Sequence, residues 1–446
     1  MKILNNDKIQ KLIDIFGDDA QLHLVGGAVR DEIMGLEPKD LDFATKFHPK
    51  EVIKKCKAKN IRFIETGIRR GTITVVIDGE PIEITTFRNY NDENQFTETI
   101  EEDLTARDFT INAIAINVHT GEVVDPFGGK EDIKNKRIKA VGEQPQKRFM
   151  EDPHRAIRMC RFAAKFDFSI EGITLLSAID VSHRHLTDIA IERIQQELVK
   201  ILTLKDGKQV VKAIHHLDEI RFFDFFIPEL NVCKGVEQNH FHSFDVFNHI
   251  LKVVEGTPNI LVVRLAALLH DIAKPATVTV GDDGVRHFLT HEDVGAEMAK
   301  EILVRLKFPN DVTKDVCFLI KQHMRSINMK GKGVRKLIRD LGEHLDNWML
   351  LKHADKLGGR PEHINEIFND KWNKFLDRLE QEQNREEKHP FHELAINGND
   401  VLRVLRIKPG KKVGKVLNTL MDMVLENPEI NERENLLNLI KELPLE

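Results

Sequence analysis

The two aspartates of Asp40-Leu41-Asp42 are the residues whose types and spacing best suit chemistry. Side chains two apart on a β-strand lie on one face, so a strand here would bring both carboxylates together. Two neighbouring carboxylates repel each other unless a cation lies between them. A hard divalent ion such as Mg²⁺ binds carboxylate oxygens and keeps positions open for triphosphate oxygens. The pair therefore predicts a metal site, although the same pattern also arises by chance in surface turns.

A glycine pair, Gly26 and Gly27, precedes these aspartates and is followed by Arg30 and Asp31. Glycine lets backbone N–H groups approach an anion closely, as in the glycine-rich loops that hold phosphates. Arg30 would help to place a triphosphate, or it would pair with Asp31 or Glu32. A glycine loop followed by the aspartate pair predicts a nucleotidyl-transfer site.

Two later segments carry polar side chains at helical spacing. Asp108 and Asn112 would share one face of a helix. Asp152 and Arg155 are three residues apart and offer an acceptor carboxylate and a forked donor, which suit the edges of nucleobases. The alternative is that Asp152 only caps a helix that starts at the following proline. Further candidates are Arg107, Arg158 and Arg161 for phosphate or RNA, Arg193 (or an intrahelical ion pair), and Glu83 as a third carboxylate (or an exposed strand position).

A second group of candidates lies in an apolar run. His270 and Asp271 interrupt the hydrophobic pattern of residues 261–275. Burying two polar groups there costs free energy unless they are hydrogen-bonded or bound to a metal. Imidazole and carboxylate ligands suit a divalent transition metal or Mg²⁺. Lys274, three residues after Asp271, could face a phosphate.

The elements expected around these residues change character along the chain. Residues 72–77 are rich in β-branched side chains, and Asp78-Gly79 predicts a hairpin turn. From Asp152 onward strand signals nearly vanish. The sequence therefore predicts an α+β protein with a small mixed α/β head at 1–140, a helical neck and body at 141–235, an all-helical domain at 240–375 and a helical tail at 390–446.

Composition limits the class of protein. The 446 residues exceed one ordinary core, and 41% hydrophobic with 31% charged residues is typical of a soluble globular protein. No run of about eighteen apolar residues occurs, so no membrane span is expected. Four scattered cysteines predict reduced thiols and a cytoplasmic location. The net charge is −6, yet residues 134–165 hold ten basic and three acidic residues, an excess of seven that predicts a phosphate-facing surface.

The motifs together resemble a known family. LVGGAVRD (24–31), KDLDFAT (39–45), DLTARDFTINAIAIN (103–117), EDPHRAIRMCRFAA (151–164) and IERIQQEL (191–198) resemble, in order, those of the bacterial class II tRNA nucleotidyltransferase and poly(A) polymerase family. LVVRLAALLHDIAKP (261–275) resembles the HD metal-phosphohydrolase domain that many of these enzymes carry. The resemblance covers nearly the whole chain, and the ordered set is far more specific than any single motif.

The resemblance implies an enzyme that adds C and A from CTP and ATP to the 3′ end of tRNA by a two-metal mechanism. Asp40 and Asp42 would bind Mg²⁺ at the head. Residues implied to bind the nucleotide are Gly26, Gly27, Arg30, Arg107, Asp108, Asn112, Asp152, Arg155, Arg158 and Arg161, with Asp152 and Arg155 as the protein template. His249, His270, Asp271 and Asp355 would hold a divalent ion (Mg, Mn, Ni or similar) at the HD site, and His291 and His323 are possible ligands of a second ion.

Two departures from the family pattern leave alternatives open. Ala106-Arg107 stands where the family usually has two arginines. Residues 89–102 are only fourteen and contain no Arg, Lys or Pro, which resembles the shortened loop of members that add only two C residues. CC addition, poly(A) synthesis, HD-domain hydrolysis as the main activity, and RNA binding without catalysis therefore remain alternatives. The oligomeric state is not fixed by the sequence.

Overall fold

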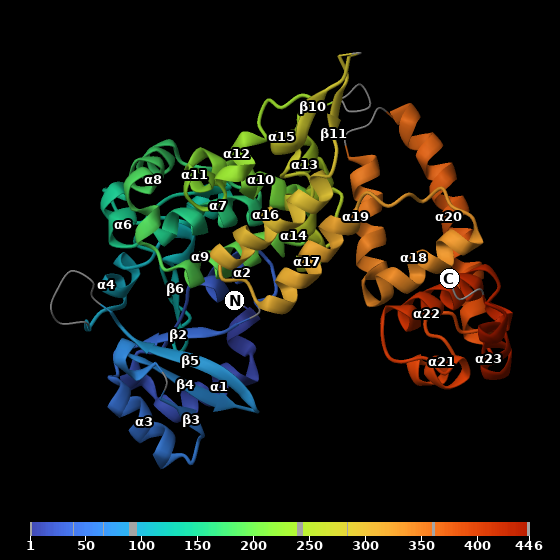
Figure 1. Ribbon diagram of the computed structural model, residues 1–446. Coiled ribbons are helices and arrows are strands. Elements are labelled where there is room, and N and C mark those ends of the chain that lie inside the picture. The colour runs from blue at the N-terminus through green and yellow to red at the C-terminus, as the bar shows by residue number, and fades with distance from the viewer. Residues whose placement is uncertain are drawn as a thin grey trace. The chain divides into compact units, whose positions relative to one another are not determined.

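The computed structural model describes residues 2–38, 40–65, 67–88, 96–238, 244–282, 284–358 and 362–443. The chain forms two compact units (Figure 1): the first consists of Met1–Leu204 and Lys208–Ile227, the second of Lys205–Gly207 and Pro228–Glu446. Within the described ranges, no helix has the length and apolar character needed to cross a membrane.

A seven-stranded sheet forms the head of the first unit, in the order β3-β4-β5-β2-β1-β6-β7. Its strands are β1 His23–Val25, β2 Asp42–Thr45, β3 Phe63–Ile64, β4 Thr72–Ile77, β5 Glu80–Thr86, β6 Ala115–Asn117 and β7 Val123–Val124. β2 and β5 pair in parallel, and the other neighbours pair antiparallel. Asp78 and Gly79 both have positive φ, 53° and 84°, so the predicted Asp-Gly hairpin turn between β4 and β5 is confirmed.

Helices make up the rest of the first unit. They are α1 Asp7–Phe16, α2 Gly27–Ile33, α3 Pro49–Ala58, α4 Ile100–Thr105, α5 Gly129–Lys134, α6 Pro145–Glu151, α7 His154–Phe166, α8 Gly172–His185, α9 Ile191–Leu202, α10 Gly207–Glu219 and α11 Phe222–Phe226, with short strands β8 Arg137–Ile138 and β9 Ser169–Ile170. Phe87 and Leu104 are fully buried in a cluster with Val25 and Ala44. Burying one such side chain stabilises the fold by about 1.5–3 kcal/mol, so this cluster fixes β1 and β2 beside α4.

The second unit is mainly helical. Its helices are α12 Pro228–Val232, α13 Val246–Glu255, α14 Leu261–Leu269, α15 Lys274–Thr277, α16 His291–Arg305, α17 Asn310–Gln322, α18 Gly331–Leu341, α19 Leu345–Leu357, α20 Glu362–Lys388, α21 Gly398–Leu405, α22 Lys411–Glu426 and α23 Arg433–Glu442. α14 is buried along most of its length and packs against α13, α17 and α19.

One element of the second unit differs from the sequence prediction. Residues 240–375 were expected to be all-helical, but β10 Val278–Val280 and β11 Arg286–Phe288 form an antiparallel hairpin. The β-branched Val278-Thr279-Val280 favours a strand, and Gly284, at φ 74°, supplies the turn. The predicted fold class, α+β with a mixed head and a helical remainder, is confirmed.

Candidate functional site

One pocket of the first unit, about 740 Å³ in volume, collects most of the predicted nucleotide-site residues. It is lined by Gly26, Gly27, Arg30, Asp40, Asp42, Arg107, Asp108, Asn112, Asp152, Arg155, Arg158, Arg161 and Arg193, among others. These residues come from the β1–α2 turn, the start of β2, the segment before β6, and helices α7 and α9. Segments far apart in the sequence therefore converge on one basic cavity that ends at two carboxylates.

The two aspartates reach this pocket from different backbone environments. β2 begins at Asp42, whereas Asp40 lies in the bend before it, so the prediction that one strand carries both carboxylates is wrong. β1 ends at Val25, where Gly26 turns the chain away, and residues before Asp42 therefore lack a strand partner on that side. Both carboxylates nevertheless line the same cavity.

The charges around Asp42 fit a cation. Asp42 is opposite Glu83 in the parallel β2–β5 register. Partial desolvation, the charge of Glu83 and the charge of Asp40 all raise the pKa of Asp42, and the charge of Arg107 lowers it. A group of carboxylates that disfavour each other's ionised form is the donor set that a divalent cation stabilises.

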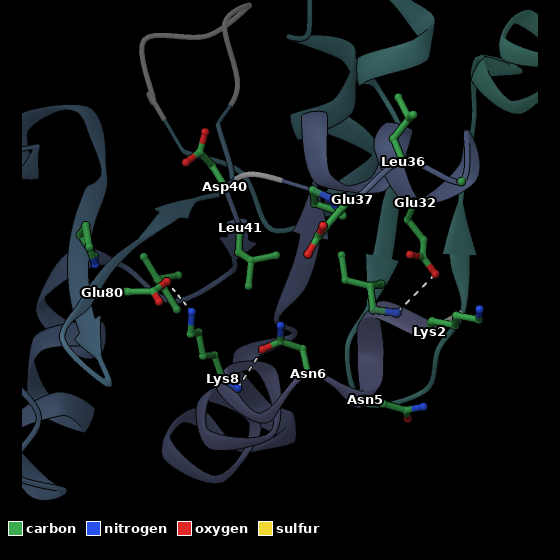
Figure 2. Close-up of a pocket in the computed structure, with 15 residues that line it drawn as sticks. Lys2, Asn5, Asn6, Lys8, Glu32, Leu36, Glu37, Asp40, Leu41 and Glu80 are labelled. Atoms are coloured by element: carbon green, nitrogen blue, oxygen red, sulfur yellow. Dashed lines mark hydrogen bonds and ion pairs between the residues drawn. The ribbon is translucent and has the colours of Figure 1, made fainter.

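Asp40 also lines a second, larger cavity, about 1050 Å³, shown in Figure 2. Its walls are the N-terminal segment, the α2–β2 connection and the start of β5; Lys8 pairs with Glu80, and the backbone N–H of Ile3 donates to Glu32. Among the described residues, its acidic side chains are Glu32, Glu37, Asp40 and Glu80, and its basic ones are Lys2 and Lys8. A triphosphate would be repelled there, so the arginine-rich pocket is the better nucleotide site.

Arg30 is buried in the wall behind the glycine turn. It donates to Oδ1 of Asp31 at 2.9 and 2.7 Å and to Oδ1 of Asn112 at 2.6 Å. Its guanidinium also lies 4.6 Å from the ring centroid of Phe166. The predicted alternative of an Asp31–Arg30 pair is therefore present, and Arg30 orders the pocket wall. A Cβ on Gly26 would lie 3.0 Å from Nη1 of Arg107, so this position has little room for a side chain.

Asp108 and Asn112 are brought together, but not by the predicted helix. Thr110–Asn112 (η4) is a single 3₁₀ turn between a bridged Phe109 and β6. Nδ2 of Asn112 donates to Oδ1 of Asp108 at 2.9 Å. Burial opposes ionisation of Asp108, yet the charge of Arg158 and the bond from Asn112 outweigh it and lower its pKa to about 2. Asp108 is therefore an ionised acceptor in the cavity wall at neutral pH.

The predicted template residues face the same cavity with different partners. Asp152 accepts from Arg193 at 3.0 and 2.7 Å and from the backbone N–H of His154 at 3.3 Å. α7 begins at His154, two residues after Asp152, so the helix starts later than predicted. Nη1 and Nη2 of Arg155 donate to the carbonyls of Arg148 and Ala106 at 2.8 and 3.1 Å. The intrahelical pair considered for Arg193 is replaced by its pair with Asp152.

Glu197 is a site residue that the sequence reasoning missed. It is 1% exposed and accepts from Nε of Arg161 at 2.6 Å, and Arg158 lies 3.9 Å away. Burial opposes its ionisation, but Arg161 lowers its pKa below the usual range. The quoted segment 191–198 contains this glutamate, but only the packing of α9 on α7 reveals its partner.

The second unit contains a compact set of possible metal ligands. His249, His270 and Asp355 form one group, and Asp271, His291 and His323 form another. All six side chains are at least 94% buried. Nε2 of His270 lies 3.2 Å from Oδ2 of Asp271 and 3.4 Å from Nε2 of His249, while Nε2 of His291 lies 3.2 Å from Nε2 of His323. The four predicted ligands and the two possible ones therefore converge.

The four histidines present lone pairs to the centre of this set. Each Nδ1 contacts a backbone carbonyl, of Gly358, Ala267, Phe288 and Ile320 in chain order. A carbonyl only accepts, so Nδ1 carries the proton of a neutral ring and Nε2 is left as an acceptor. Burial and the neighbouring His270 lower the pKa of His323 to about 3, which keeps that ring neutral, whereas Asp271 outweighs burial and raises the pKa of His270. Four facing acceptors with two carboxylates fit divalent cations.

Known protein families match the two parts of the chain that carry the nucleotide pocket and the cluster of possible metal ligands. Residues 22–139 match the family described as the poly A polymerase head domain, and residues 240–368 match the HD domain. Residues 167–234 match a family described as a probable RNA and SrmB-binding site of polymerase A. The chain thus combines a nucleotidyltransferase head with an HD domain, two families that depend on metal ions.

Relatives over the full length give the family. An A-adding tRNA nucleotidyltransferase of Deinococcus radiodurans is 31% identical over 412 residues, 90% of each chain. A CCA-adding enzyme of Pediococcus pentosaceus is 30% identical over 445 residues, covering 98% of this chain and 96% of that one. The chain belongs to the family of tRNA nucleotidyltransferases that includes the CCA-adding and A-adding enzymes, and the resemblance noted in the sequence is confirmed.

Solved structures support the fold. The Bacillus stearothermophilus CCA-adding enzyme in complex with CTP superposes with a TM-score of 0.72 at 24% identity and 98% coverage of both chains. The Thermotoga maritima CCA-adding enzyme complexed with tRNA has a TM-score of 0.61 at 21% identity, covering 99% of this chain and 97% of that one.

Proposed function

We propose that this chain extends the 3′ end of tRNA with C and A taken from CTP and ATP. The observation that carries the proposal is the single pocket in which the aspartate pair, the glycine turn and the arginines of α7 converge. The terminal 3′-hydroxyl attacks the α-phosphate, the bond to the β-phosphate oxygen breaks, and pyrophosphate leaves. Curated relatives at 30–31% identity over most of the chain carry the names of tRNA-extending enzymes, which supports this reading.

The aspartates would hold Mg²⁺ at the reacting end of the pocket. Bound there, Mg²⁺ favours the deprotonated 3′-hydroxyl and neutralises the triphosphate. Asp40 and Asp42 supply oxygen ligands, with Glu83 opposite Asp42 as a third carboxylate. Gly26 and Gly27 let the backbone approach the phosphates, and Arg107 lies beside that turn.

Base selection is assigned to Asp152 and Arg155. Both line the nucleotide pocket, where a carboxylate and a guanidinium can pair with the Watson–Crick edges of C and A. Arg193 bonds to both oxygens of Asp152, and because each carboxylate oxygen can accept two hydrogen bonds, the carboxylate retains capacity to accept from a base. We assign the ribose hydroxyls to Asp108 and Asn112, and the hydrogen bond between their side chains in the pocket wall supports this assignment.

The number of nucleotides that the chain adds is proposed from its relatives and from one loop. Full CCA addition agrees with most of the named relatives, and A addition with the Deinococcus relative. The short loop at 89–102 favours CC addition as the alternative; residues 89–95 lie outside the described part of the chain, and Phe96 and Thr97 return to the sheet beside Arg88 and Phe87.

Three transcripts test both the reaction and its extent. Purified protein with Mg²⁺ is given three tRNA transcripts, which end before CCA, after the first C and after CC. CTP and ATP are supplied separately and together. Extension of the shortest transcript to CCA is the expected result. Arrest after CC makes the chain a CC-adding enzyme, and addition of A alone makes it an A-adding enzyme. Long A tails would identify a poly(A) polymerase, and absence of any extension would overturn the proposal.

The HD site supports a second activity, hydrolysis of phosphate monoesters or cyclic phosphates. The supporting observation is the convergence of four buried histidines with Asp271 and Asp355. Water would attack phosphorus, the ester P–O bond would break, and the leaving oxygen would take the proton. Lys274 lies at the same pocket, 2.6 Å from Asp271, where its charge can meet a phosphate. The ion, Mg²⁺, Mn²⁺, Ni²⁺ or similar, is identified by loading each in turn and measuring phosphate release.

The domain boundaries and the cytoplasmic location are also proposed. The division at 1–140, 141–235, 240–375 and 390–446 is supported by family matches at 22–139, 167–234 and 240–368. The cytoplasm is supported by four cysteines that form no disulfide in the described chain.

A further inference from the structure

The HD centre opens to solvent through a small pocket with a wall formed by the β10–β11 hairpin. The pocket has a volume of about 210 Å³. Asp271, His291, His323 and Asp355 line its inner end, and Arg286, His287, Phe288, Leu289, Met324 and Lys356 are among the residues that line the rest. The hairpin is therefore the element that determines which molecules reach the centre.

Among the described residues, Lys274, Lys356 and Arg286 bring positive charge to the pocket, and Arg286 is the one held away from the metal ligands. Lys274 lies 2.6 Å from Asp271, and Lys356 lies 3.0 Å from Asp355. Arg286 instead donates Nη1 to Oε2 of Glu237 at 2.6 Å. Of these three described residues, Arg286 can turn toward an incoming anion without disturbing the metal centre.

The pair of Arg286 with Glu237 is suited to exchange. The side chains of Arg286 and Glu237 are 39% and 77% exposed. An ion pair this open to water stabilises the fold little, because solvent screens it and both side chains lose freedom. A phosphate would offer the planar guanidinium two parallel acceptors, which is a stronger arrangement than the contact it replaces.

Two large apolar side chains line the outer part of the pocket beside its charged residues. Leu289 is 72% exposed and Met324 48% exposed, although both are large hydrophobic side chains at the pocket mouth. The volume of about 210 Å³ is below the roughly 300 Å³ at which pockets begin to enclose drug-sized ligands. The pocket therefore has space for a phosphate and a sugar, and an attached planar ring would lie against the apolar mouth.

We propose that Arg286 leaves Glu237 to bind the phosphate of a nucleoside monophosphate, whose base contacts Leu289 and Met324. Arg286 thereby becomes a positioning residue for phosphate esters at the HD centre, and the hairpin becomes its specificity element. The proposal rests on the phosphohydrolase activity proposed above, but the binding of phosphate by Arg286 can be measured separately from hydrolysis.

Tryptophan fluorescence separates this pocket from the head. The chain has two tryptophans, Trp348 and Trp372, and both lie in the second unit. Nε1 of Trp348 donates to the carbonyl of Gln322, the residue before His323, so its emission reports on the HD centre. Orthophosphate, ribose 5-phosphate and AMP are titrated into the full chain, once with EDTA and once with Mg²⁺.

Arg286→Gln is the test variant and Arg305→Gln the matched control. Arg305 is also an exposed arginine of the second unit, paired with Glu229 at 2.9 Å. We expect Arg286→Gln to weaken all three ligands about tenfold, Arg286→Lys to recover part of that loss, and Glu237→Gln to tighten binding. In hydrolysis, Arg286→Gln should raise KM more than it lowers kcat. Leu289→Ser should weaken AMP about threefold and leave ribose 5-phosphate unchanged.

Equal binding by the Arg286→Gln and Arg305→Gln variants overturns the proposal, as does a wild-type protein that responds to none of the three ligands. Equal affinity for AMP and ribose 5-phosphate overturns the assignment of the base to the apolar mouth. A protein that binds ribose 5-phosphate through Arg286 but releases no orthophosphate from it overturns the proposed hydrolysis and leaves the role of Arg286 in place.

Discussion

Arg158 donates two hydrogen bonds to Oδ2 of Asp108, at 2.9 and 2.7 Å. Arg158 lies on α7, and Asp108 precedes the turn that leads into β6, so the pair joins two walls of the nucleotide pocket. Asp108 is 8% exposed. Hydrogen bonds between charged groups are stronger than neutral ones, and the geometry of the pocket therefore depends on this contact.

Removal of the arginine should disorder the pocket more than it destabilises the chain. Arg158→Ala leaves the Asp108 carboxylate buried without its main counter-charge. This should destabilise the pocket wall around Asp108 by about 2–4 kcal/mol. We expect KM for CTP and ATP to rise at least about tenfold, with partial recovery in Arg158→Lys, which keeps the charge but loses the fork. The control is Arg184→Ala, since Arg184 pairs with Asp180 on the surface of α8 and should leave KM unchanged.

The same pair makes a prediction about acid stability. The pKa of Asp108 is lowered to about 2 by Arg158 and Asn112, against the penalty of burial. A carboxyl whose pKa is lowered on folding contributes stability above its unfolded pKa of about 3.9 and loses it as pH falls toward the folded value. The contribution is on the order of 2 kcal/mol at neutral pH. The unfolding temperature of the first unit should therefore fall between pH 4 and 2 in the wild type. In Asp108→Asn, which lacks this carboxyl, it should fall less steeply over the same range.

Local sequence patterns predicted the parts of the site that depend on near neighbours. The glycine turn, the Asp-Gly hairpin and the spacing of residues on α7 follow from backbone preferences that act within a few positions. The partners of the charged residues could not be predicted in this way. Asp152 pairs with Arg193, 41 positions away, and Arg161 pairs with Glu197, 36 positions away. Such pairs are determined by helix packing, which no local pattern contains.

Two wrong predictions have the same origin. The apolar residues around Asp108 and Asn112 suggested a helix, yet this segment is held extended before and after a single turn by the bridge of Phe109 to Ala140 and by β6. Asp40 was placed on a strand although β1 is too short to pair with it. In both places the neighbours in the sheet, which are distant in sequence, decide the backbone conformation.

Loss of both head carboxylates should abolish extension without abolishing binding. Asp40→Ala combined with Asp42→Ala removes the proposed Mg²⁺ ligands, and several kcal/mol of transition-state stabilisation corresponds to a rate loss of about 10³-fold or more. The affinity for tRNA, measured by filter binding, should change little. Retained extension in this double variant would show that the chemistry lies elsewhere, and Asp18→Ala with Asp19→Ala, an exposed pair in the same unit, is the control.

Substitution of Asp152 should reduce base selection, whereas substitution of Arg193 should preserve it. Asp152→Ala removes the proposed acceptor for the base, so misincorporation of UTP and GTP should increase about tenfold relative to CTP, the effect expected for one lost hydrogen-bonding contact. Arg193→Ala frees the carboxylate of Asp152, which should remain able to pair with a base and preserve selectivity. Single-nucleotide addition with each of the four triphosphates measures both. If Arg193→Ala is as unselective as Asp152→Ala, the ion pair rather than the carboxylate alone is needed.

Chelation should lower the thermal stability of the second unit. With an ion bound, the facing Nε2 atoms of His249 and His270, 3.4 Å apart, and of His291 and His323, 3.2 Å apart, are held by a cation rather than left as neighbouring lone pairs. A ligand that binds only the folded state stabilises it by about 2.7 kcal/mol at one hundred times its dissociation constant. EDTA should therefore lower the unfolding temperature reported by Trp348, and Mg²⁺, Mn²⁺ or Ni²⁺ should restore it. His249→Ala with His323→Ala should remove this dependence while nucleotide addition in Mg²⁺ continues at the wild-type rate. A transition that is insensitive to chelation in the wild type would mean that the six side chains hold no ion.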